Sequence, residues 1–450
     1  MLLNGLRRGA FALLLILGAA APAAAMNIER VVSPLGIEAW LVQDRLIPVV
    51  AVEFSFRGGT ALDPAGKEGL VQLTVDLMTE GVGDLDSQAF KAKLEDNAIS
   101  IDFGAGADSV TGSMKTLNTT RDLAVDLLRD ALMRPRFDAA DLERVRGSVL
   151  VGLSRSAEEP GTIARRLWME TTFPNHPYSH QSRGTPQTVP TFTPADLKAQ
   201  HARMFGRDNL IVAAVGDITP AELGKLIDRV FGDLPAKAPD AGGVIAEATP
   251  QGGGKTLVVR KSVPQSLAVF GGPGLKRDDP DYFAGTIMNY ILGGGGFSSR
   301  LTLEVREKRG LAYSIGTSLS PMDHAGLLMG SVGTENGRVS QSLDLVRAEW
   351  IKMRDDGPTP QELEDAKNYI DGSYPLNLTS TSRIARTLVQ LQYDNLGIDY
   401  MDRRKGLIAA VTIEDVRRVA RRLLDPEKLL IVVVGEPDGL PETSPIGRGG

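Results

Sequence analysis

Hydrophobic and polar positions along the chain follow two periods, and the mixture predicts an α+β fold. Apolar residues that recur every three or four positions are typical of helices, whereas short apolar runs are typical of buried strands. The pattern predicts strands at residues 37–42, 49–56, 109–115, 267–271, 311–318 and 326–332. It predicts helices at residues 70–79, 89–97, 121–132, 139–155, 161–171, 221–230, 282–292, 338–353 and 361–370. Each half of the chain is therefore expected to be a mixed β-sheet covered by helices.

Two segments that lie 219 residues apart share one pattern, which indicates an internal duplication. Thr193 and Thr412 are each followed by an aspartate three positions later, the spacing of a capping box at a helix start. Each helix then leads to an apolar run that ends at Gly216 or Gly435 and is typical of a buried strand. Chance similarity of a common helix–strand unit is the alternative. The equal spacing favours two related domains.

A stretch rich in glycine, alanine and proline, residues 236–255, has little apolar periodicity and is interpreted as a linker. It separates a first α+β domain, residues 26–235, from a second, residues 256–440. Residues 441–450 are expected to form a flexible tail, and residues 1–25 a signal peptide.

The signal-peptide prediction depends on the order of charge and apolar residues at the N-terminus. Arg7 and Arg8 precede the apolar run 11–21, and the small residues 23–25 follow it as a cleavage site. The run is shorter than the roughly 20 apolar residues that span a bilayer. A short membrane anchor or a buried N-terminal helix is the alternative. We expect an exported, periplasmic protein whose mature chain has no membrane span.

Composition narrows the possible functions. The chain is 42% hydrophobic and 24% charged, as in an ordinary globular protein. Its net charge of −6 argues against a nucleic-acid partner. It contains no cysteine, so disulfides and thiolate metal sites are excluded and stability must come from the cores.

The histidines do not predict a metal site. His176 and His180 have a spacing that suits a helix, but Pro177 favours an extended conformation at His176. His201 and His324 stand alone. No Gly-x-Ser-x-Gly motif supports a serine hydrolase either.

A run of four glycines lies between two helical patterns. It lacks the G-x-x-x-x-G-K-[ST] spacing and the lysine of a nucleotide-binding loop. Glycines instead let another backbone approach closely, which favours contact with a substrate chain. The predicted substrate-binding residues are Gly293, Gly294, Gly295, Gly296 and Phe297.

Several stretches together resemble the pitrilysin/insulinase-type metallopeptidases, the inverted zincins. They are residues 57–81, residues 176–189, the run NLIVAAVGD from Asn209, and LGGGGFSSRLTLEVREKRGLAYSI, residues 292–315. The similarity runs across essentially the whole mature chain. It implies a clamshell of four related domains, built from one chain or from two chains of two domains. This chain would be one half of such a clamshell.

The resemblance places the family's zinc motif on a helix that has lost it. The H-x-x-E-H motif falls on Gln72, Val75 and Asp76, and the third protein ligand falls near Gly152. Catalytic zinc needs three protein ligands and an open position, and Val75 cannot act as a base. We expect no zinc and no other cofactor in this chain, with Gln72 and Asp76 simply hydrogen-bonded at a domain surface. A substitute metal site is the alternative.

A second part of the family's active site is kept. In REKRGLAY, Arg306 and Tyr313 match the arginine and tyrosine that hold the substrate carbonyl in the family. A donor aimed at a developing oxyanion contributes roughly 10²–10³-fold to the rate. An ordinary helix-end arginine and a core tyrosine are the alternative.

These observations predict a zinc-free subunit of a heterodimeric metallopeptidase that is inactive alone. A related chain bearing H-x-x-E-H would hold the zinc, and short or unfolded peptides would be the substrates. A non-catalytic scaffold or peptide-binding protein of the same fold is the main alternative. A self-sufficient peptidase with an atypical metal would need ligands that the sequence does not offer.

Overall fold

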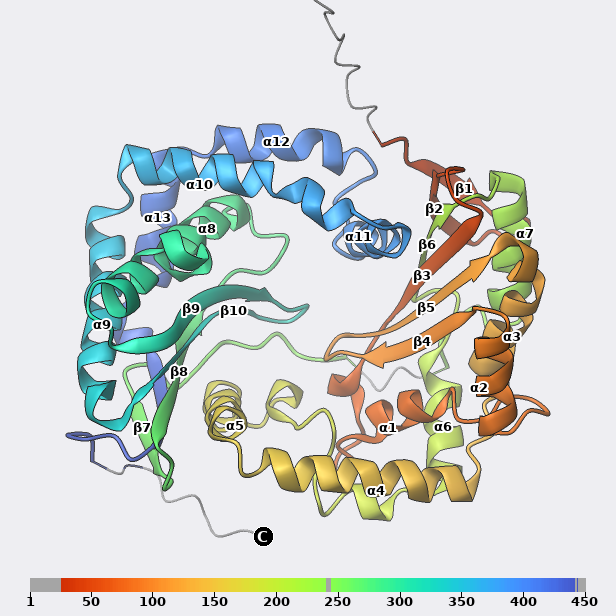
Figure 1. The fold of residues 1–450 in the computed structure, drawn as a ribbon, viewed down its shortest axis with the longest axis horizontal. Coiled ribbons are helices and arrows are strands. Elements are labelled where there is room, and N and C mark those ends of the chain that lie inside the picture. Colours follow the sequence, from red (N-terminus) through yellow and green to blue (C-terminus); the bar gives the residue numbers. More distant parts are fainter. Residues whose placement is uncertain (1–25, 240–243, 442, 444–450) are drawn as a thin grey trace, which may run out of the picture.

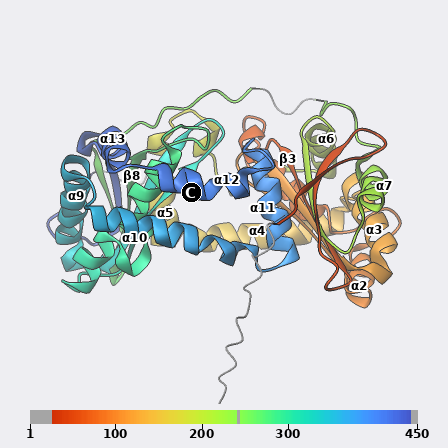
Figure 2. The ribbon, with the colours of Figure 1, turned by 90° about the horizontal axis from the view of Figure 1, so that it is seen from above.

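The computed structural model describes residues 26–239, 244–441 and 443 (Figure 1). The predicted signal peptide and most of the predicted tail lie outside the described residues. Two β-sheets stand on opposite sides of the molecule, with helices on their outer faces and further helices running between them (Figures 1 and 2). The predicted α+β class is confirmed.

The first sheet has the strand order β1-β2-β6-β3-β5-β4. β6 runs parallel to β2, and the other neighbours are antiparallel. The strands are β1 (Glu29–Val32), β2 (Glu38–Gln43), β3 (Val49–Arg57), β4 (Ser100–Ala105), β5 (Ser109–Leu117) and β6 (Leu210–Gly216).

In the residues that the structure describes, the second sheet repeats this arrangement without a counterpart of β1. Its order is β7-β11-β8-β10-β9, and β11 is parallel to β7 as β6 is to β2. β6 and β11 both end at a glycine with positive φ, 141° at Gly216 and 151° at Gly435. The strands are β7 (Thr256–Arg260), β8 (Gln265–Pro273), β9 (Ala312–Pro321), β10 (Gly326–Glu335) and β11 (Leu430–Gly435). The common topology supports the predicted duplication.

The helices agree with the predicted ones within a few residues at each end. In chain order they are α1 (Leu70–Leu77), α2 (Ser87–Asp96), α3 (Arg121–Met133), α4 (Ala139–Ser156), α5 (Pro160–Thr172), α6 (Pro194–Met204), α7 (Pro220–Phe231), α8 (Tyr282–Asn289), α9 (Val339–Asp356), α10 (Pro360–Gly372), α11 (Thr381–Tyr393), α12 (Tyr400–Ala410) and α13 (Ile413–Leu423). The predicted helix 282–292 is α8 followed by the π-helical turn Tyr290–Gly294. α11, α12 and strands β1, β4 and β7 were not predicted.

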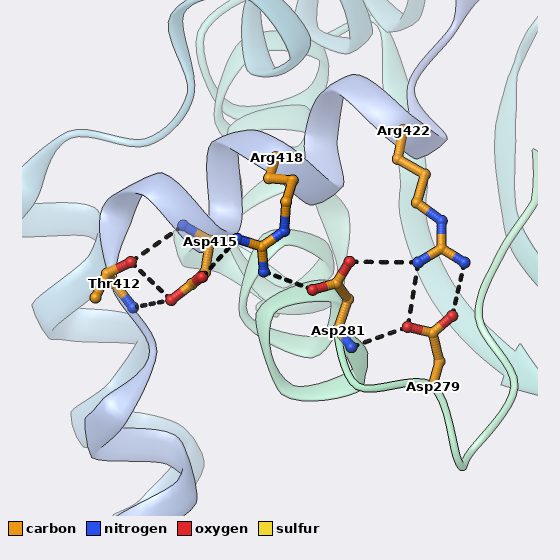
Figure 3. Close-up of polar contacts among 6 residues, drawn as sticks. All are labelled: Asp279, Asp281, Thr412, Asp415, Arg418 and Arg422. Atoms are coloured by element: carbon orange, nitrogen blue, oxygen red, sulfur yellow. Dashed lines mark hydrogen bonds and ion pairs between the residues drawn. The ribbon is translucent and has the colours of Figure 1, made fainter.

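Capping boxes fix where several helices begin. At α6 and α13 the threonine hydroxyl accepts the backbone N–H of the aspartate three residues on, and that aspartate accepts the threonine N–H. At α13 the interaction continues as a chain of ion pairs (Figure 3). This chain ties α13 to the loop before α8, and it runs through Asp415, Arg418, Asp281, Arg422 and Asp279.

Two helices are exchanged between the halves. α5, from the first half, packs on β8 and β11 of the second sheet, and α11, from the second half, packs on β3 and β6 of the first (Figure 1). Trp168 of α5 is fully buried there, and its indole Nε1 donates to the backbone oxygen of Leu430 at 3.3 Å. Leu388 of α11 joins a core with strand residues Trp40 and Ala213. Each sheet is therefore covered on one face by a helix from the other half.

The predicted linker carries no helix or strand in residues 236–239 and 244–255. It touches both halves, because Gln251 N–H donates to the backbone oxygen of Thr172 and Ala248 N–H to that of His324. The exact domain boundaries stay a prediction. In the described residues, no helix combines the length and the apolar character that crossing a membrane requires.

Candidate functional site

Helix α1, which the sequence resemblance matched to the family's zinc helix, has a buried start. Asp63 caps it, because its carboxylate accepts the backbone N–H groups of Gly69 at 2.7 Å and Val71 at 2.8 Å. Burial raises the pKa of Asp63 to about 7 although both hydrogen bonds oppose the shift. Gly69 has a φ of 92°, and a Cβ there would lie 2.4 Å from the backbone nitrogen of Gly184. The helix is therefore held by its entry loop.

The two polar residues of this helix bind each other. Gln72 Nε2 donates to Asp76 Oδ1 at 2.7 Å, as predicted for this pair, and both residues are half-buried. Val75 between them is only 1% exposed and belongs to the core. Burial raises the pKa of Asp76, while the hydrogen bond from Gln72 and the charge of Arg183 oppose the shift. The two side chains are therefore hydrogen-bonded to each other within the chain, and Val75, at the position of the family's base, cannot accept a proton.

Gly152 lies on α4, which packs against α1. A Cβ at this position would meet no atom within 4 Å, so a ligand side chain is missing rather than replaced by a neighbour. In the part of the chain that the structure describes, no three His, Asp or Glu side chains are grouped to hold a metal ion. The residues at the family's zinc positions do not fit a catalytic zinc.

Three of the four histidines have partners of their own. His176 has the predicted extended backbone, and its Nδ1 accepts the Tyr178 N–H at 3.2 Å. His201 lies with Nε2 2.8 Å from the backbone oxygen of Leu132, and burial lowers its pKa. His324 Nδ1 is 3.3 Å from a carboxylate oxygen of Glu247. These contacts explain the three side chains without a metal.

Arg306 lies at the end of the π-helical segment Thr302–Glu307. Its guanidinium carbon is 4.9 Å from the centre of the Phe297 ring, a cation–π contact, and its Nε is 3.5 Å from Glu307. Phe297 is itself 67% exposed. The structure thus brings a predicted substrate-binding residue against a predicted catalytic one on an accessible surface.

Tyr313 occupies a β-bulge at the start of β9. Ser314 pairs with Gly333 but Ala312 pairs with Thr334, so Tyr313 is the unpaired extra residue. A Cβ at Gly333 would come within 2.6 Å of the tyrosine ring, so the ring lies over this glycine. Tyr313 is 57% exposed, and the alternative that it is a core tyrosine is wrong. Gly333, which shapes this site, was not predicted.

The glycine run packs mainly against its own chain. A Cβ at Gly293 would lie 2.5 Å from Thr317 Oγ1 of β9, and one at Gly294 would lie 2.5 Å from Asn289 Nδ2. A Cβ at Gly295 would lie 2.7 Å from the backbone oxygen of Tyr290. Gly296 has a φ of 58° and open space around it. Internal packing therefore explains three of the glycines, and their contact with a substrate stays a prediction.

Two hollows that the sequence did not predict lie on the faces covered by the exchanged helices. A cleft of about 630 Å³ lies over β3, β4 and β5 beside α11, and its lining includes Glu53 and Arg386. A smaller groove of about 270 Å³ lies over β9 and β10 beside α5. We call the smaller one the Arg165 groove; it is lined by Arg165, Val269, Gly316, Thr317, Ser318, Ser320, Met329, Gly330 and Ser331. Neither lining contains Arg306, Tyr313 or the four degenerate zinc positions.

Comparison with known proteins agrees with this geometry. Residues 191–370 match the family model described as the peptidase M16 inactive domain. The non-peptidase homolog YmxG of Helicobacter pylori is 26% identical over 87% of this chain and 90% of its own length. An uncharacterized zinc protease of Streptomyces coelicolor is 28% identical over 78% of this chain and 79% of its own.

A solved structure matches almost end to end. The crystal structure of a peptidase M16 inactive domain from Pseudomonas fluorescens superposes with a TM-score of 0.85 and 29% identity. The match covers 93% of this chain and 99% of that one. These matches confirm the resemblance to the pitrilysin/insulinase-type metallopeptidases and show that the chain is similar to the inactive, M16-type members of that family.

Proposed function

We propose that this chain is the zinc-free subunit of a two-chain metallopeptidase and supplies Arg306 and Tyr313 to the zinc site of a partner chain. The observation that carries the proposal is the exposure of Tyr313, 57%, on a bulge that leaves its ring accessible above Gly333. A β-bulge next to an active site often serves to re-aim a side chain, and here it leaves the Tyr313 hydroxyl within reach of a bound peptide. The zinc positions of the same chain are meanwhile filled by a self-paired Gln72 and Asp76.

The two side chains suit complementary tasks. The Tyr313 hydroxyl can donate a hydrogen bond to the oxyanion that forms on a peptide carbonyl. The Arg306 guanidinium offers several donors in a fixed fork and can hold the peptide in both the ground and the transition state. A zinc ion in the partner would activate the attacking water. Peptide substrates and export of the mature chain, which the first 25 residues suggest, are parts of the same proposal.

A second candidate function is a non-catalytic scaffold or peptide-binding protein. The name of the Helicobacter pylori relative, a non-peptidase homolog, favours it. The two candidates differ in whether a zinc-bearing chain depends on this one for activity.

Reconstitution separates the two. The mature chain is mixed with an H-x-x-E-H homologue from the same genome, and hydrolysis of a fluorogenic peptide is measured for each chain and for the mixture. We expect cleavage by the mixture that neither chain shows alone. Full activity of the zinc-bearing chain by itself would reject the subunit role and leave the scaffold function.

A further inference from the structure

The exchanged helices α5 and α11 each present an arginine at the same place. Both helices contain 13 residues, and Arg165 and Arg386 are the sixth residue of each. Each arginine lines the hollow that its helix forms with the sheet of the other half. The duplication therefore allows a direct comparison of the two arginines within one molecule.

Arg386 has a carboxylate to neutralise it. Its Nη2 lies 3.5 Å from Glu53 Oε1, and Glu53 is only 6% exposed on the face of β3. Burial raises the pKa of Glu53, and the charge of Arg386 opposes that shift. In the first sheet, Ala213 lies three residues before Gly216, and its partner on β3 is Glu53.

Arg165 has no such carboxylate. In the second sheet, Val432 lies three residues before Gly435, and its partner on β8 is Val269. Val269 therefore takes the place of Glu53, and no Asp or Glu lines the Arg165 groove. Within the described residues the side chain of Arg165 has no hydrogen bond or ion pair. Both halves therefore have the arginine, but only the first sheet supplies a carboxylate to pair with it.

The Arg165 groove adjoins the Tyr313 site along one strand. Ser331 of β10 lines the groove, and Gly333, two residues further along β10, lies under the Tyr313 ring. Side chains two apart on a strand share a face and are about 7 Å apart. A peptide whose carbonyl contacts Tyr313 would therefore place a neighbouring side chain over the groove. Around it are serine and threonine hydroxyls and glycines, which leave room for that side chain.

We propose that Arg165 is a specificity residue that binds the carboxylate of an Asp or Glu side chain about two residues from the peptide bond held by Tyr313. This inference rests on the proposed function, since it assumes a peptide at Tyr313. The substrate class is then an acidic peptide, and its carboxylate supplies the negative charge that Glu53 supplies to Arg386 in the other half. Such a pair is charge-assisted, and because Arg165 is exposed to water its strength is that of a surface ion pair.

The test compares two labelled peptides that are identical except for Glu or Gln at one position, scanned through three positions. Binding to the full mature chain is measured by fluorescence anisotropy. At one position we expect the Glu peptide to bind about threefold to fivefold more tightly, on the scale of one exposed ion pair. Arg165→Met, which keeps the length of the side chain, should remove this preference and leave the affinity for the Gln peptide unchanged.

Arg386→Met is the matched control, because it removes the arginine at the same helix position in the other half. It should leave the Glu preference intact. Arg165→Glu should transfer the preference to a Lys peptide, which a merely structural arginine would not do. A Glu preference that survives Arg165→Met, or none at any position, overturns the inference while peptide binding still supports the proposed function. Failure of the chain to bind any of the peptides overturns both.

Discussion

Tyr178 donates a hydrogen bond of 2.7 Å to the carboxylate of Asp108, and the same relationship recurs in the second half of the chain. There Tyr393 donates to Asp323, also at 2.7 Å, and each tyrosine lies 70 residues from its aspartate. The two pairs meet, because the Asp323 N–H donates to Asp108 at 3.2 Å. Burial and the neighbouring carboxylate raise the pKa of both tyrosines, so both remain protonated donors. The two halves are thus joined where the β4–β5 and β9–β10 turns, which carry Asp108 and Asp323, meet.

Removing one hydroxyl should weaken this junction. Tyr178→Phe leaves the buried ring in place and takes the donor from Asp108, so we expect a loss of about 1–3 kcal/mol in the free energy of unfolding. Tyr393→Phe should cost a similar amount. Because the pairs touch, the double variant should depart from additivity by at least about 0.5 kcal/mol. Urea denaturation checks all three, and strictly additive losses would show that the two pairs act separately.

Asp63 should make stability depend on pH. Its pKa is about 7 in the folded protein against an ordinary value of 3.8, so the folded state binds more protons between these values. The contribution of Asp63 to stability therefore falls as pH rises from about 4 to about 7. Urea denaturation of wild type and Asp63→Asn at pH 5 and pH 7.5 gives the free energy of unfolding of each. Relative to the variant, the wild type should be less stable at pH 7.5 than at pH 5. An equal difference at both values would contradict the burial argument.

The purified mature chain should contain no stoichiometric zinc. Gln72 and Asp76 are bound to each other, and Gly152 offers no ligand. Elemental analysis of protein prepared without chelators should therefore give well below one zinc per chain. About one zinc per chain, lost in Asp76→Ala, would show that α1 has kept a metal site.

Tyr313→Phe should lower kcat of the reconstituted peptidase by roughly 10²-fold or more, the scale of one lost oxyanion donor. Assembly should be unaffected, because the ring and its contact with Gly333 remain. Arg306→Ala should raise KM and lower kcat together, since the guanidinium would hold substrate in both states. Steady-state kinetics on one fluorogenic peptide measures both changes.

The matched control is Tyr369→Phe. Tyr369 is 59% exposed and has no proposed role, so its substitution should leave the kinetics unchanged. Arg309 is less suitable as a control, because it donates to the backbone and side chain of Glu304. If the complex with Tyr313→Phe has wild-type rates, Arg306 and Tyr313 have only a structural role.

Gly333→Ala should reproduce much of the Tyr313 defect without touching the tyrosine. Its new methyl group would lie within 2.6 Å of the ring, and an exposed ring can swing away. We expect a tenfold or greater loss of kcat with little change in the midpoint of thermal unfolding. Gly104→Ala, on the edge strand β4 of the other sheet, meets Thr111 at an ordinary 3.4 Å and is the control. Equal kcat values for the two variants would show that catalysis does not depend on the position of the Tyr313 ring.

Local signals in the sequence were enough for the helix starts and for the helix that carries Gln72 and Asp76. The capping threonines Thr193 and Thr412 fix their helices through contacts three residues away, and such spacing is visible in the sequence. Tyr313 could be named from a motif, but its exposure depends on a bulge and on Gly333 across the sheet. The Arg165 groove needs α5 to cross to the other half, a long-range contact that periodicity does not record.

The exchange of α5 and α11 also sets the order in which the protein can be completed during synthesis. The ribosome finishes the first sheet at Gly216 and reaches the helix that covers it only at Thr381. In that interval Trp40, Val42 and Ala213 form an apolar sheet face with no helix over it. Exposed faces of this kind favour aggregation, so the nascent first half is expected to need a chaperone. A premature stop before α11 would leave that half permanently unfinished, however intact its own residues were.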